Sequence, residues 1–161
     1  MTKIDPRIWR HTILTGEDEE TLRNLRDEAS TARKQHGADS DEYRAAASSA
    51  DEFAAEAKAR GTEVILRTIA SRKKMRAIRD AHPPREDNET DKALGFNADT
   101  YPEALAAACL ASPALNDEAR EEFLDSLTEG DGELVSTAAY TLHRLPSADP
   151  KGLLLSGPTA T

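Results

Sequence analysis

The chain has little of what small domains usually need for a tightly packed core. Only 4% of its 161 residues are aromatic, and Trp9 is the single tryptophan. Alanine must therefore fill much of the interior, and since an alanine side chain buries little area, each such contact stabilises the fold only modestly. We expect marginal stability for the isolated chain, helped by a partner or by self-association.

Cysteine is also scarce, because Cys109 is the only one and an intrachain disulfide is excluded. Its neighbours Ala106, Ala107, Ala108 and Leu110 indicate a small apolar core residue in a reducing compartment, not a nucleophile with a nearby base. No apolar run is long enough to span a membrane, and the first residues do not resemble a signal peptide. These features predict a cytosolic protein without a membrane partner.

Sequence motifs of catalytic, metal-binding and nucleotide-binding sites are missing as well. The four histidines are scattered singly, without a second ligand at helical spacing, which argues against a metal site. No glycine-rich phosphate loop, nucleophile elbow or dinucleotide fingerprint is present. We therefore predict a protein that binds other proteins, with no catalytic, metal-binding or cofactor-binding residues and no cofactor.

Charge is plentiful and unevenly distributed. The chain carries a formal net charge of −9, which disfavours general binding to nucleic acid. One basic island interrupts the acidity. Two interpretations stay open: the island contacts nucleic acid or an acidic partner, or it pairs with the chain's own carboxylates. Its members are Arg67, Arg72, Lys73, Lys74, Arg76 and Arg79.

Residues 17–60 predict an antiparallel helical hairpin, preceded by a lead-in segment, residues 1–16. Apolar positions recur at spacings of three and four, from Leu22 to His36 and from Tyr43 to Ala57, on either side of a turn at Gly37. Thr15 or Gly16 is expected to cap the first helix, and Asp39 with Glu42 resembles a capping box for the second.

Residues 62–69 form the clearest strand pattern, and Gly61 before them is expected to end the hairpin with a left-handed cap. A lone strand leaves its backbone groups unpaired, so either residues 7–14 pair with it or another chain does. Trp9, in that segment, is either a latch onto the domain or an anchor for a partner.

Helical signals dominate the remainder. Ser71 is expected to cap a helix over 72–82, Thr100 a helix that runs to Pro113, and Asn116 a helix that ends at Gly130; the last helix reaches Leu145. The predicted fold is mainly α (α+β with at most a small sheet): an N-terminal antiparallel hairpin, one central strand and a compact bundle of about four helices. The strand and bundle occupy residues 61–145, and residues 146–161 form a flexible tail.

One combination of motifs is unusual. The basic helix closes with His82-Pro83-Pro84, and a later turn reads Gly95-Phe96-Asn97-Ala98-Asp99-Thr100-Tyr101-Pro102. Together with Arg67 after the strand and the alanine-rich final helix, residues 61–145 resemble tail assembly chaperones of siphophages that infect actinobacteria.

The resemblance implies a role in virion assembly in the host cytoplasm. Such chaperones bind the long tape measure protein, keep it soluble and recruit tail tube subunits around it. The alternatives are a structural tail or neck component that stays in the virion, and a nucleic-acid-binding phage regulator. The residues that we expect to contact a partner are Arg72, Arg76 and Arg79 on the basic helix, with Tyr43, Phe53 and Tyr101.

Overall fold

A computed structural model describes residues 6–144. Within them the fold is mainly α with one small sheet, as predicted, and consists of seven helices and three strands. None of the described helices is long and apolar enough to cross a lipid bilayer. The predicted flexible tail, residues 146–161, and Leu145 lie outside the described residues. The elements in chain order are β1 (Ile8–Ile13), α1 (Gly16–His36), α2 (Asp41–Arg60), β2 (Thr62–Arg67), α3 (Arg72–Asp80), α4 (Glu89–Leu94), α5 (Thr100–Cys109), β3 (Leu110–Ser112), α6 (Asp117–Asp125) and α7 (Glu129–Arg144).

The chain divides into two compact units. The first is Arg10–Val64, and the second joins the residues up to Trp9 to those from Ile65 onward. The sheet has the order β1-β2-β3, so the lead-in supplies the strand that β2 needs. The predicted single strand is therefore one of three within the described residues, and the boundary between the two compact units falls inside β1 and β2.

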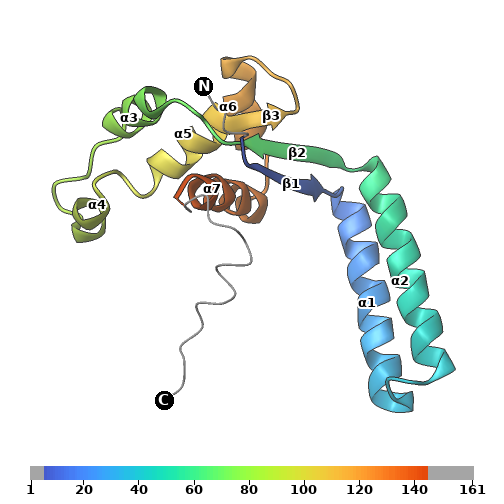
Figure 1. The fold of residues 1–161 in the computed structure, drawn as a ribbon. Coiled ribbons are helices and arrows are strands. Elements are labelled where there is room, and N and C mark those ends of the chain that lie inside the picture. Colours follow the sequence, from blue (N-terminus) through green and yellow to red (C-terminus); the bar gives the residue numbers. More distant parts are fainter. Residues whose placement is uncertain (1–5, 145–161) are drawn as a thin grey trace, which may run out of the picture. The chain divides into compact units, whose positions relative to one another are not determined.

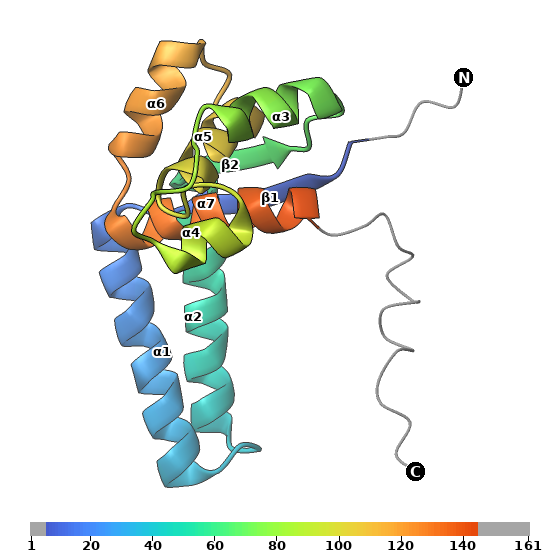
Figure 2. The ribbon, with the colours of Figure 1, turned by 90° about the vertical axis from the view of Figure 1, so that its left-hand side faces the viewer.

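In the first unit, α1 and α2 lie side by side and antiparallel, as Figures 1 and 2 both show. Their shared seam buries Leu22, Ala29, Ala50 and Ala57, which confirms the alanine-rich pattern. His36, predicted to continue the seam, is exposed. Small side chains let the two helices approach closely but bury little apolar area.

Side-chain caps begin both helices of the hairpin. The Thr15 hydroxyl accepts a hydrogen bond from the backbone N–H of Asp18, as expected. For α2 the cap is the Ser40 hydroxyl, which accepts from the N–H of Tyr43, so the predicted capping box of Asp39 and Glu42 is wrong. Ser40 is the cap because α2 begins at Asp41, one residue later than a capping box of Asp39 and Glu42 requires.

An ion pair joins the first turn of α1 to the last turn of α2. The Arg60 Nη2 atom lies 2.8 Å from Asp18 Oδ1. Hydrogen bonding to Arg60 lowers the pKa of Asp18, and the same bond raises the pKa of Arg60. The pair therefore favours the antiparallel register of the two helices.

Gly61 does end α2, but not with the predicted left-handed cap. Its φ is −72° and its ψ is 172°, an extended conformation that any residue adopts. Glycine is required there for space. A Cβ on Gly61 would lie 2.6 Å from Thr12 Cγ2 and 2.8 Å from the carbonyl oxygen of Ile13. The close approach of β1 decides this position, and no local pattern encodes it.

Gly61→Ala is expected to destabilise the protein by about 1–3 kcal/mol, because the backbone carbonyl of Ile13 must move to admit a methyl group. The measurement is the free energy of urea unfolding. Gly132→Ala is the matched control: Gly132 lies inside α7 and nothing is within 4 Å of its added Cβ, so stability should stay constant or rise slightly. Equal stability of Gly61→Ala and wild type would disprove the close approach.

In the second unit, α5 contacts α3, α6 and α7. The core consists of side chains that are at most 4% exposed, contributed by β2, α5, β3 and α7 and by the turn before α5. The largest are Leu66, Phe96, Tyr101, Leu105, Leu110 and Val135. Strand β3 pairs antiparallel with β2, with Ile65 opposite Ser112 and Leu66 opposite Leu110.

The boundaries of three predicted helices differ in the structure. Helix α3 ends at Asp80, not at His82. Helix α5 ends at Cys109, because the next three residues pair with β2 as β3 and not with their own helix. Helix α6 ends at Asp125, not at Gly130; the Thr128 hydroxyl accepts from the N–H of Asp131 and starts α7 instead. The predicted caps Ser71 and Asn116 are confirmed.

Candidate partner-binding surface

The structure places the six predicted contact residues in different environments. Arg72, Arg76 and Arg79 are exposed on α3, in the second unit. Tyr43 and Phe53 are half-buried in the hairpin unit. The Arg33 guanidinium carbon lies 5.9 Å from the Tyr43 ring centroid, and that of Arg60 lies 5.7 Å from the Phe53 centroid. Both rings therefore have a cation as a neighbour within the hairpin.

Tyr101 does not lie on the surface. It is 2% exposed, and its ring centroid lies 4.4 Å from that of Phe96 in the core of the second unit. The Arg79 guanidinium carbon is 6.0 Å from both ring centroids. The expectation that Tyr101 meets a partner is thus corrected, because its ring packs inside and helps hold Arg79.

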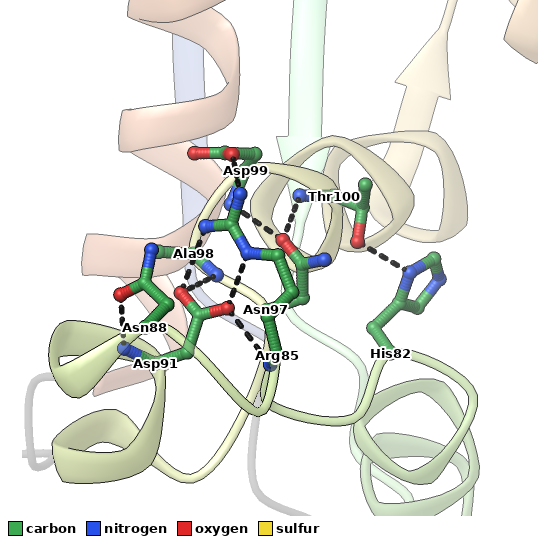
Figure 3. Close-up of polar contacts among 8 residues, drawn as sticks. All are labelled: His82, Arg85, Asn88, Asp91, Asn97, Ala98, Asp99 and Thr100. Atoms are coloured by element: carbon green, nitrogen blue, oxygen red, sulfur yellow. Dashed lines mark hydrogen bonds and ion pairs between the residues drawn. The ribbon is translucent and has the colours of Figure 1, made fainter.

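The two unusual motifs meet in one polar network, drawn in Figure 3. At its centre is Asp91, a fully buried carboxylate on α4. Its oxygens accept from Arg85 Nε at 2.7 Å and Nη2 at 3.0 Å, and from the backbone N–H of Ala98 at 3.1 Å. Arg85 follows His82-Pro83-Pro84, and Ala98 lies in the turn before α5, so Asp91 ties the two motifs together.

The charge of Asp91 is strongly stabilised. Hydrogen bonding to Arg85 lowers its pKa well below the usual range and outweighs the opposing effect of burial; the N–H groups of Ala98 and Arg85 lower it further. The same pair raises the pKa of Arg85. Arg85 Nη1 also reaches Asp99 Oδ2 at 2.5 Å. The loop after α3 is therefore held by a paired charge that stays ionised at neutral pH.

Thr100 does not cap α5. The helix follows Asp99, which forms no side-chain cap hydrogen bond, and the side-chain acceptor at this turn belongs to Asn97. Its side-chain oxygen accepts from the backbone N–H groups of Asp99 at 3.0 Å and Thr100 at 3.3 Å. The Thr100 hydroxyl instead forms a hydrogen bond with His82 Nδ1 at 2.9 Å, and the N–H of Asn97 donates to the carbonyl of His82. The residues behind the resemblance thus have a structural effect, which is to fix the end of α3 against the start of α5 (Figure 3).

The basic island is not neutralised by the described part of the chain. Ion pairs form elsewhere, at Arg10, Arg44, Arg60, Arg85, Lys92 and Arg120. Within residues 6–144, none of the six island cations has a carboxylate oxygen within 4.0 Å. The interpretation that the island pairs with the chain's own acidic segments is not supported there. Five of the six cations are left facing solvent, and Arg79 borders the aromatic pair.

Beside this island lies a groove of about 670 Å³. It runs between the segment that links β2 to α3, the outer part of β3 and the start of α6, and it is lined by both apolar and charged side chains. Its cations are Arg67, Lys74 and Arg120. We call this the α3–β3 groove.

Arg120 is a residue that the sequence analysis missed. Its side chain is 27% exposed, and its Nη1 lies 3.5 Å from Asp117 Oδ1, while its Nε is buried without a hydrogen-bond partner. The available signal was a single arginine in an otherwise acidic helical segment, Asp117–Asp125. Only the tertiary structure brings it near Arg67 and Lys74.

His143 fixes the segment that lines the groove. Since the carbonyl oxygen of Ala139 can only accept, Nδ1 of His143, 2.7 Å away, carries the proton; Nε2 then accepts from the N–H of Ile69 at 2.9 Å. Cys109, also at the groove, is 4% exposed, and burial raises its thiol pKa to about 12. A thiol with such a pKa is a packing residue and not a nucleophile at neutral pH.

The described residues hold no group of three or more histidine, cysteine or carboxylate side chains that could bind a metal ion. What the surface does offer is positive charge that has no carboxylate partner within residues 6–144, beside the apolar side chains of the α3–β3 groove. Comparison with protein-family models, with curated proteins and with solved structures finds no match.

Proposed function

We propose that the chain is a bacteriophage tail assembly chaperone that acts in the host cytoplasm. It binds the tape measure protein, keeps it soluble and helps to recruit tail tube subunits during virion assembly. In this proposal the protein works by binding and not by catalysis. The support from the sequence is the resemblance of residues 61–145. The support from the surface is the cationic face of α3 beside the α3–β3 groove, which has no carboxylate partner within 4.0 Å among residues 6–144.

The cations of the basic island are the main observation behind this proposal, because the rest of the chain is acidic. A net charge of −9 keeps a complex soluble, whereas a local basic face gives one side of the molecule an affinity for an acidic partner. An assembly chaperone must also release its client. Exposed charge contacts contribute modest free energies each and so favour a reversible complex.

The test is co-expression with the tape measure protein encoded beside this gene. We expect the soluble fraction of that client to rise several-fold and the two chains to purify together. Expression of the client alone, and with an unrelated acidic helical protein, provides the controls. A client that stays insoluble and does not co-purify would refute the proposal.

A structural tail or neck component is the alternative, favoured by the edge strand β3, which could pair with another subunit. Mass spectrometry of purified particles separates the two functions. A chaperone should be absent from finished particles, whereas a structural component should be present in stoichiometric amount.

A further inference from the structure

The α3–β3 groove combines two kinds of contact in a small space. Its apolar lining includes Ile69 after β2, Ile78 on α3 and Leu110 on β3. Three cations lie among these side chains: Arg67 at the end of β2, Lys74 on α3 and Arg120 on α6. The one carboxylate of the lining belongs to Asp117, whose side chain is fully exposed.

The cations of the groove lack adequate partners within residues 6–144. Arg67 and Lys74 have no carboxylate oxygen within 4.0 Å there. Arg120 reaches Asp117 only at 3.5 Å, and its buried Nε has no hydrogen-bond acceptor. The buried Nε is out of reach of an incoming group, but the side chain is 27% exposed, so a carboxylate in the groove can form a charge-assisted hydrogen bond with the Nη atoms of Arg120.

Resting on the proposed function, we infer that the α3–β3 groove binds an acidic segment of the client that also carries apolar side chains. Carboxylates of the segment meet Arg67, Lys74 and Arg120. Its apolar side chains cover Ile69, Ile78 and Ala111, which are half-buried. Charge complementarity selects the segment, and apolar burial adds affinity. The groove, and not the outer face of α3 as a whole, is then the specific site.

A protein segment fits this groove better than nucleic acid does. No aromatic side chain lines the groove, so bases would find no stacking surface. Contact of the apolar lining with the phosphates and sugars of a nucleic acid would be unfavourable, because these polar groups would lose water without gaining hydrogen bonds. Strand β3 is at the edge of the sheet among the described strands, so its backbone can also pair with an extended peptide.

The experiment compares two charge reversals of equal size on the full chain. Arg67→Glu with Lys74→Glu changes the groove, and Arg23→Glu with Arg26→Glu changes two exposed cations of α1 that are not part of the groove lining. The probes are an array of short peptides that combine Asp or Glu with Leu, Ile or Ala, and a matched array with Lys or Arg in place of the acids. Circular dichroism checks that both variants keep wild-type helicity.

We expect wild type to bind acidic apolar peptides and to ignore the basic array. The groove variant should bind the same peptides about tenfold more weakly, while the α1 control stays within about twofold of wild type. Equal loss in both variants, no loss in the groove variant, or no binding to the acidic array would overturn the inference. Retention of a DNA fragment that only the groove reversal abolishes would assign the groove to nucleic acid instead.

Different results would refute the chaperone function and the assignment of the groove. If the tape measure protein is not solubilised but the peptide result holds, the chaperone function is wrong and the groove remains an acidic-peptide site. If the client is solubilised equally well by wild type and by the groove variant, the function stands and the client binds elsewhere.

Discussion

Leu105→Ala is expected to lower the free energy of unfolding by about 2–5 kcal/mol. Leu105 is fully buried in the middle of α5, the helix that contacts α3, α6 and α7. Truncation removes apolar contacts and leaves a cavity, because the three neighbouring helices cannot all move inward to fill it. Leu105 is one of the few large side chains that are fully buried, so this loss is a large part of the total stability.

The measurement is urea unfolding followed by circular dichroism, with Leu134→Ala as control. Leu134 is 43% exposed on α7, so its truncation should cost less than about 1 kcal/mol. Phe123 and Leu142 are half-buried, and their truncation should cost an amount between the two. Equal losses for Leu105→Ala and Leu134→Ala would mean that the core is placed wrongly.

Asp91→Asn is expected to loosen the loop that joins α3 to α5. An amide cannot accept both guanidinium hydrogen bonds as a carboxylate does, so Arg85 loses its bidentate partner and the N–H of Ala98 loses its charged acceptor. Backbone hydrogen exchange at Ala98 and Arg85 should accelerate on the order of tenfold or more. The overall urea midpoint should also fall.

Asp99→Asn is the matched control for that change. Asp99 pairs with the same arginine, but its side chain is 70% exposed, and exposed ion pairs contribute little. Exchange at Ala98 should therefore stay near wild type in Asp99→Asn. If both variants behave alike, the buried position of Asp91 has no special effect.

The same network predicts a pH dependence. The pKa of Asp91 is lower in the folded chain than the ordinary 3.8, so its contribution to stability is complete above that value. This contribution is lost as the pH falls from about 4 toward the folded pKa, because the proton binds more tightly to the unfolded chain. Acid unfolding curves of Asp91→Asn should lack this portion of the loss.

Local patterns predicted most of the secondary structure correctly. The alanine seam of the hairpin, the caps at Thr15, Ser71 and Asn116, and the strand after Gly61 are all encoded by residues within one or two turns of each other. Hydrogen bonds over three or four residues need no distant partner. Such features are therefore readable from the sequence.

The errors occur where a distant partner competes with local preference. Ala111 and its neighbours favour continuation of α5, but pairing with β2 makes them β3. The Thr100 hydroxyl bonds to His82, eighteen residues earlier, and does not cap its own helix; the side-chain oxygen of Asn97 accepts from the N–H of Thr100 instead. Gly61 is kept free of a side chain by β1, some fifty residues away in the sequence.

The candidate site, too, was predictable from the sequence in some features and not in others. The basic island and its helix follow from the sequence alone, as do the net acidity, the mainly α fold and the two motifs that carry the resemblance. Only the tertiary structure decided that Asp91 joins those motifs, that Tyr101 is buried, and that Arg120 lies with Arg67 and Lys74 along one groove. The physical reason is that charge, periodicity and caps act over a few residues, whereas burial and ion pairing depend on which segments meet when the chain folds.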